Sequence, residues 1–134
     1  MAGGFDYSQF EEQYRNTVSI QQEFHTFLSN FLLQEGLRAI RAVRPLTPVD
    51  TGNLRRNWAL SDVRVLADRV EVDLVNPVEY ASFMEHGFTY QKDGKERRFP
   101  GFHMAEISIA RIQQNMPRRF NTAFASWLRA KGWG

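Results

Sequence analysis

Hydrophobic residues in the first third of the chain recur at the spacing of an amphipathic helix. Steps of three and four residues predict a long helix over residues 19–43. Its apolar stripe begins with Ile20, Phe24, Phe27 and Phe31. Pro45 and Pro48 are expected to end it, because each disfavours helical geometry in the residue before it. Gly36 either weakens this helix or lets another element pack closely against it.

A short helix is predicted ahead of the long one. Ser8 and Glu11 have the spacing of a capping box, so this helix should start near Gln9.

The last third of the chain carries a second stripe at steps of three or four. It consists of Ala105, Ile109, Ile112, Met116, Phe120, Ala123 and Trp127. The stripe stays in phase across Pro117, which predicts one long kinked helix.

Polar and apolar residues alternate between these helices. Residues 54–60, 63–66 and 70–74 follow a period of two, which predicts a half-buried antiparallel sheet. In the first strand Leu54, Arg56 and Trp58 share one face, and Arg55 lies on the opposite face.

A short middle helix and a hairpin are expected next. Asn76 is predicted to cap the helix, with Pro77 at its first position and Gly87 at its end. Asp93-Gly94 then predicts a hairpin over residues 88–99 that projects from the body as a finger. Pro100 separates this finger from the last helix.

These elements predict one α+β domain over residues 1–134. A small antiparallel sheet is expected to carry a long N-terminal helix, a short middle helix and a long kinked C-terminal helix packed on it.

The segment RPLTPVDTGNLRRNW, residues 44–58, is predicted to be a corner between helix and sheet. Pro48, Asp50, Thr51 and Gly52 supply the residues of a turn. A phosphate-binding nest at this turn remains an alternative, although it carries one glycine and no helix is expected to follow.

Charge is distributed unevenly along the chain. The balance is −2 over residues 1–50 and +4 over residues 51–134, and 14 of the 17 basic residues are Arg. Arg favours bidentate pairing at interfaces, which indicates an assembly surface. No apolar run is long enough for a membrane span, and the start of the chain lacks the pattern of a signal peptide.

Candidate chemistry is sparse. The chain has no cysteine, which excludes disulfides, thiol nucleophiles and cysteine-zinc sites. Glu85, His86 and His103 form the nearest thing to an acid–base or metal cluster, but the spacing does not place two ligands on one helix face. Glu71 and Asp73 share the outer face of a strand. We therefore expect no catalytic, cofactor-binding or metal site, and no small-molecule substrate.

Three motifs in order resemble the tail-completion or head–tail joining proteins of tailed phages and prophages. They are Thr47-Pro48-Val49-Asp50-Thr51-Gly52-Asn53-Leu54-Arg55, Val78-Glu79-Tyr80-Ala81-Ser82-Phe83-Met84-Glu85-His86-Gly87 and Pro100-Gly101-Phe102-His103-Met104. The resemblance covers about residues 44–110.

The resemblance implies a non-enzymatic structural subunit of the virion, assembled in the bacterial host cytoplasm. It implies a homo-oligomeric ring, commonly a hexamer, at the head–tail junction or the tail end. Neighbours would be connector or adaptor proteins and the tail tube or its terminator, with DNA passing transiently through the ring and no membrane involved.

A set of charged residues is predicted to contact neighbouring subunits or partners. It consists of Arg55, Arg56, Glu71, Asp73, Glu85, Arg97 and Arg98. Two other functions remain open: a DNA-contacting protein of the portal exit or packaging machinery, and a small hydrolase that uses Glu85, His86 and His103.

Overall fold

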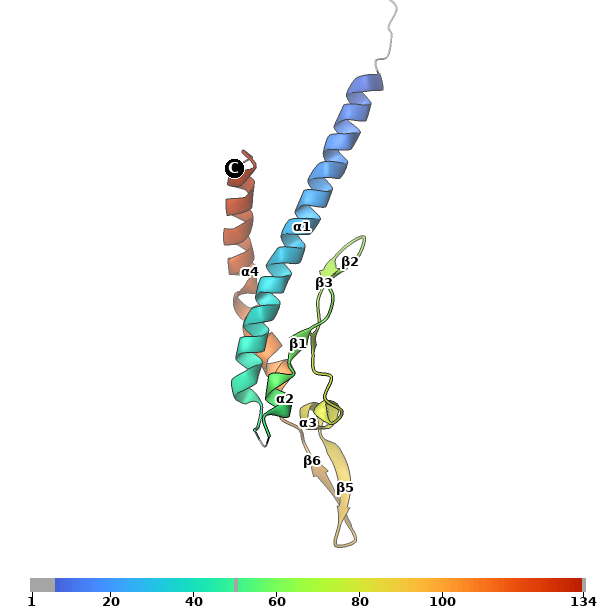
Figure 1. Ribbon diagram of the computed structural model, residues 1–134, viewed down its shortest axis with the longest axis vertical. Helices are drawn as coiled ribbons and strands as arrows, with labels where there is room; N and C mark the ends of the chain where they lie inside the picture. The colour runs from blue at the N-terminus through green and yellow to red at the C-terminus, as the bar shows by residue number, and fades with distance from the viewer. Residues whose placement is uncertain (1–6, 50, 134) are drawn as a thin grey trace, which may run out of the picture.

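Two long helices form the frame of the molecule. The computed structural model describes residues 7–49 and 51–133, with side chains from residue 19 onward (Figure 1). Helix α1 (Tyr7–Leu46) and helix α4 (Met104–Ala130) run antiparallel, and the shorter elements lie along the side of α1 away from α4 and at its lower end. The α+β fold class is confirmed.

Helix α1 is one continuous helix, so the prediction of two helices before residue 43 was wrong. No Gly or Pro interrupts the chain between Tyr7 and Gln34, and residues such as Thr17 only weaken a helix locally. The helix ends at Leu46, with Pro45 in its last turn. The side chains of the predicted capping box, Ser8 and Glu11, lie outside the described side chains.

Aromatic rings hold α1 against α4. Ring centroids are 5.8 Å apart for Phe24 and Trp127 and 5.4 Å apart for Phe31 and Phe120. Such offset or edge-to-face pairs contribute beyond the area that they bury. Helix α4 runs through Pro117 as predicted, and Figure 1 shows its orange lower part inclined to its red upper part.

The predicted strand over residues 54–60 was wrong. Residues Asn53–Arg56 form the one-turn helix α2, and only Ala59–Leu60 form a strand, β1. Leu54 and Trp58 are both buried, as predicted. Positions i and i+4 share a face in a helix and also in a strand, so the apolar pair could not distinguish the two.

The remaining strands form a ribbon instead of a wide sheet. Strand β1 pairs with β4 (Leu74–Val75), and β2 (Arg64–Val65) pairs with β3 (Val70–Glu71), all antiparallel. The amide of Ser61 donates to the Asp73 carbonyl at 2.9 Å between the two ladders. This long irregular hairpin lies beside α1 (Figure 1).

The middle helix α3 (Ala81–His86) begins later than predicted. Asn76 does not cap it. Its Oδ1 accepts the Val78 amide at 3.1 Å, and its Nδ2 donates to the Leu54 carbonyl at 2.8 Å. Asn76 therefore closes a turn and ties that turn to α2, with Pro77 inside the turn. Gly87 ends α3 at φ 83°, as predicted.

Strands β5 (Phe88–Lys92) and β6 (Lys95–Phe99) form the predicted finger. Asp93 and Gly94 turn the chain with φ values of 55° and 72°, as a two-residue hairpin turn requires. The finger projects from the lower end of the molecule (Figure 1). At its base Gly87 and Gly101 cross closely, since a Cβ on Gly101 would lie 2.6 Å from the Gly87 amide nitrogen and 2.5 Å from the Glu85 carbonyl oxygen.

The core lies where the four helices meet. Its buried residues are Val43, Leu54, Trp58, Ala81 and Met104. Higher up, a Cβ on Gly36 would lie 2.7 Å from a Leu60 methyl, so this glycine permits the ribbon to approach α1. None of the described helices is long and apolar enough to cross a membrane.

Candidate assembly surfaces

The predicted corner at residues 44–58 is held by Thr47, which is buried. Its hydroxyl donates to the Val43 carbonyl at 2.7 Å and accepts the Trp58 indole N–H at 2.8 Å. The Thr47 carbonyl accepts from the Arg55 guanidinium at 2.8 Å. Asp50 lies outside the described residues. The segment is therefore a structural corner, in which the Thr47 hydroxyl joins α1 to Trp58 and the Thr47 carbonyl joins it to Arg55 of α2.

The strand prediction for the two arginines of this corner was wrong: it placed Arg55 on the outer face and Arg56 on the core face. Arg55 is half-buried and engaged with Thr47, whereas Arg56 is exposed. Arg56 lies over Gly52 and donates to the Thr51 carbonyl at 3.2 Å. A guanidinium thus occupies the turn that the phosphate-nest alternative required. Of the pair, Arg56 is the one available to a neighbour.

Glu85 acts inside the molecule, at the start of α4. Its carboxylate accepts the Ala105 amide at 2.9 Å and the Glu106 amide at 3.1 Å. The residue is 8% exposed. These amides are among the four at a helix N-terminus without a partner in the helix, and a carboxylate also suits the positive end of the helix dipole. Glu85 replaces the missing side-chain cap of α4 and does not present a charge to a neighbour.

The structure does not assemble the hydrolase candidate. Both oxygens of Glu85 accept backbone amides. His103 Nδ1 lies 2.9 Å from a Glu106 oxygen and its Nε2 lies 2.9 Å from the Pro100 carbonyl. Among the described residues no group of three His, Asp or Glu side chains could hold a metal ion.

Glu71 and Asp73 lie on the exposed ribbon, where arginines of the same ribbon pair with both. Arg64 lies 3.1 Å from Glu71 and 3.0 Å from Asp73. Hydrogen bonds from Arg69 and then Arg64 hold the pKa of Glu71 below its ordinary value of 4.5. The ribbon's acids are therefore partly neutralised within their own element.

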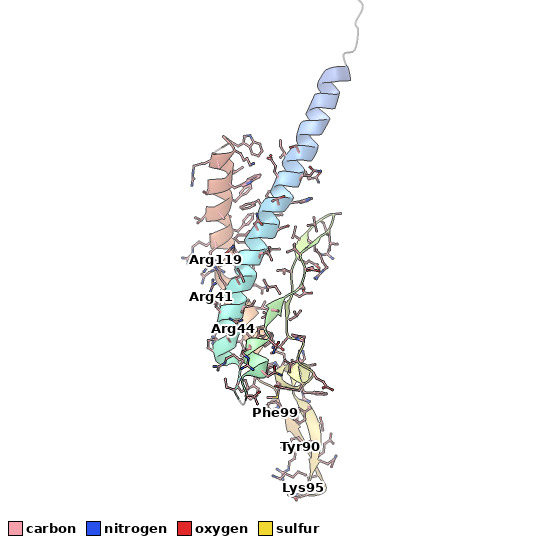
Figure 2. All side chains as sticks on the ribbon, in the orientation of Figure 1. Arg41, Arg44, Tyr90, Lys95, Phe99 and Arg119 are labelled. Atoms are coloured by element: carbon pink, nitrogen blue, oxygen red, sulfur yellow. The ribbon has the colours of Figure 1, made fainter. Side chains whose placement is uncertain are left out.

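One face of the finger is aromatic and basic. The register pairs Phe88 with Phe99, Tyr90 with Arg97 and Lys92 with Lys95, which places these six side chains on one face. Figure 2 shows Phe99, Tyr90 and Lys95 following one another toward the tip. The opposite face pairs Thr89 with Arg98 and Gln91 with Glu96. Arg98 donates to the His86 carbonyl at 3.0 Å, so it helps to fix the finger to α3.

Aromatic rings continue from this face onto the body. The finger-base aromatic cluster consists of Phe83, Phe88, Tyr90, Phe99 and Phe102. Its successive ring centroids lie 5.3 to 6.1 Å apart. Phe83 is 57% exposed and Phe102 42% exposed, so these rings lie largely in solvent. Exposed apolar patches of this kind mark interaction sites.

The sequence analysis missed an ion pair that links the two long helices. Arg119 Nε donates to Glu35 at 2.9 Å, and the Glu35 side chain is 5% exposed. The hydrogen bond to Glu35 raises the pKa of Arg119. These residues are 84 positions apart, so no local spacing could have identified the pair. Other arginines of α1 and α4, among them Arg41 and Arg118, form no ion pair among the described residues.

One comparison with known proteins identifies a relationship. Residues 14–87, more than half of the chain, match the family described as "Bacteriophage HK97-gp10, putative tail-component". The match includes the corner, the ribbon and α3, and it ends where the finger begins. No curated protein and no solved structure matches the chain.

Proposed function

Because the chain belongs to the HK97-gp10-like family of phage tail components, we propose that it is a ring-forming structural subunit of a phage or phage-like particle. The ring is a homo-oligomer, expected to be a hexamer, at the head–tail junction or the tail end of the virion. Its neighbours are connector or adaptor proteins and the tail tube or its terminator. The proposal assigns no enzymatic activity to the chain.

The finger is the observation that carries this proposal. Residues 88–98 are all exposed, and an isolated two-stranded hairpin is at best marginally stable in water. A hairpin with three aromatic residues on one face gains stability when that face is covered. Docking on another subunit would cover it.

The finger also suits the geometry of a ring. Rings are built from heterologous contacts, in which one surface meets a different surface of the next copy. A projecting finger cannot cover its own aromatic face, and it carries Tyr, Phe and Arg, which are enriched in protein interfaces. Arg97 shares that face with Tyr90, so a guanidinium stands beside the aromatic anchor.

Contacts within the subunit support a smaller set of interface residues than the sequence predicted. Glu85 and Arg55 are engaged inside the subunit, and Glu71 and Asp73 are paired within the ribbon. The proposed contact residues are therefore Arg97, the finger-base aromatic cluster and, as a secondary site, Arg56. Arg98 contributes by holding the finger in place.

The test combines Tyr90→Ser with Arg97→Glu in cells that produce the particle. Both side chains are exposed, so the variant subunit should retain the parent's circular dichroism spectrum and melting temperature. We expect it to be missing from particles, and particles with joined heads and tails to fall at least tenfold in electron micrographs.

The matched control combines Thr89→Ser with Gln91→Glu on the opposite face of the finger. It also changes two exposed residues and introduces one Glu, so its net charge falls by one unit against two in the test variant, and it should assemble like the parent. Normal assembly of the Tyr90→Ser/Arg97→Glu variant would contradict the docking role. Absence of the parent subunit from purified particles, probed with gold-labelled antibody, would contradict the structural function itself.

A further inference from the structure

Arginines follow the side of the two long helices that faces away from the ribbon. Figure 2 shows Arg119, Arg41 and Arg44 one after another along this side. Arg38 and Arg118 line one hollow between α1 and α4, which joins the arginines of the two helices. We call this surface the arginine face. Its members are Arg38, Arg41, Arg44, Arg111, Arg118 and Arg129, with Arg119 at the seam.

Helix geometry places the α4 arginines on one stripe. Arg111, Arg118 and Arg129 are separated by 7 and 11 residues, close to two and three turns of an α-helix. On α1, Arg38, Arg41 and Arg44 recur at steps of three, so they lie on adjoining parts of one face. Each helix therefore carries a row of cations, and the two rows meet where Arg38 and Arg118 line the same hollow.

Carboxylates are missing from these rows. Residues 36–46 and 107–130 contain seven arginines and no Asp or Glu. Glu35, which lines the hollow with Arg38 and Arg118, is buried and already engaged by Arg119 and Arg38. Among the described residues, no ion pair involves Arg41, Arg44, Arg111, Arg118 or Arg129, and all five are exposed.

We propose that the arginine face binds the phosphate backbone of duplex DNA without reading its sequence. Guanidinium groups bind phosphate oxygens in a bidentate manner. Backbone binding requires rows of cations without intervening acids, which is what the two helices present. A protein interface would combine exposed charges of both signs around an apolar centre, whereas the one carboxylate that lines the hollow, Glu35, is buried and engaged by Arg119 and Arg38. The uncharged polar side chains of the hollow are Gln34, Thr122 and Ser126.

This inference goes beyond the proposed ring and does not need it, because one subunit carries the whole face. The test is fluorescence anisotropy of a labelled random-sequence duplex titrated with the purified full chain at several salt concentrations. If three to five phosphates are neutralised, a plot of log K against log salt should have a slope of about −3 to −4.5. Affinity should then fall about 50- to 500-fold between roughly 50 and 200 mM salt.

Two triple variants with equal net charge locate the binding surface. Arg41→Gln/Arg111→Gln/Arg118→Gln removes exposed cations of the arginine face and spares Arg119, which is structural. We expect its slope to be shallower by about 2 to 3, because each phosphate contact contributes close to one unit. Lys92→Gln/Lys95→Gln/Arg69→Gln removes two cations of the finger and one of the ribbon and should keep the parent's slope.

A parent that does not bind the duplex at about 50 mM salt would overturn the proposal. An equal loss in both triple variants would also overturn it, because binding would then follow net charge alone. If the arginine-face variant binds DNA like the parent but stops particle assembly, the face meets an acidic protein instead. A triple Arg→Lys variant that binds with the parent's slope would support phosphate contacts, since lysine also binds phosphate.

Discussion

Replacement of Glu85 should destabilise the subunit by releasing the start of α4. The carboxylate accepts two backbone amides, those of Ala105 and Glu106, from a nearly buried position. Loss of a helix cap costs about 0.5–2 kcal/mol, and a hydrogen bond to a charged group contributes about 1.5–3 kcal/mol. Allowing for overlap between these effects, we expect Glu85→Ala to lower the free energy of unfolding by about 2–4 kcal/mol.

Urea denaturation and thermal melting of the purified chain measure this loss. For a chain of this length each kcal/mol corresponds to about 3–5 °C in Tm, so Glu85→Ala should melt about 6–20 °C lower. Glu85→Gln keeps one acceptor oxygen and should lose about half as much. Because the contact is within one subunit, the loss should not change with protein concentration.

Glu106→Gln is the matched control for this experiment. It also removes a carboxylate at the start of α4, but its side chain is exposed and faces His103, so its loss should stay below about 1 kcal/mol. A Glu85→Ala variant within about 0.5 kcal/mol of the parent would refute the capping role. Glu85 would then return to the set of candidate interface residues.

Two further predictions concern the finger base and the ribbon. Gly101→Ala should destabilise the chain by more than about 2 kcal/mol in urea denaturation, because the new Cβ meets the Glu85 carbonyl at positive φ. Gly94 also has a positive φ, but a Cβ there would meet nothing within 4 Å, so Gly94→Ala should lower the free energy of unfolding by only about 1 kcal/mol. Equal losses in the two variants would contradict the close crossing at Gly101. The depressed pKa of Glu71 stabilises the fold above pH 4.5, and this contribution is lost as the pH falls through the folded-state pKa. Glu71→Gln should therefore lower Tm at neutral pH and match the parent in acid; a Tm difference that is constant across the pH range would contradict it.

The finger and helix α4 could be predicted from the sequence because residues close together in the chain determine them. The finger followed from Asp93-Gly94, whose two positive φ values define its turn. Helix α4 followed from an apolar stripe that keeps its phase through Pro117. In both cases the determining residues lie within a few positions of one another in the sequence.

Apolar spacing that fits both a helix and a strand led to the wrong prediction for residues 54–60. Leu54 and Trp58 were correctly placed in the core but assigned to a strand, because a spacing of four fits both periods. The strand prediction placed Arg56 on the core face and Arg55 on the outer face. In the helical turn Arg55 is half-buried and Arg56 is exposed. Gly52 at φ 83° before Asn53 favoured a helical turn over direct entry into a strand.

Partners distant in the sequence could not be predicted from one chain. Glu85 reaches amides 20 and 21 residues away, and Glu35 reaches Arg119 across 84 residues. The local sequence around Glu35 and around Glu85 does not distinguish either residue from an acid on the exposed face of a helix. Only the packing of α4 against α1 and α3 gives them their roles.

Charge in this molecule is organised by face and not by sequence half. The sequence has an imbalance of charge between residues 1–50 and 51–134, but α1 from the first half and α4 from the second both contribute to the arginine face. Glu71 and Asp73 of the ribbon are paired with Arg64 and Arg69 beside them, which reduces the negative charge that they present to a neighbour's arginines. Docking between copies should therefore depend more on the aromatic face of the finger than on salt-sensitive ion pairs. Since the finger and the arginine face are separate surfaces, variants of one should leave the other's function intact.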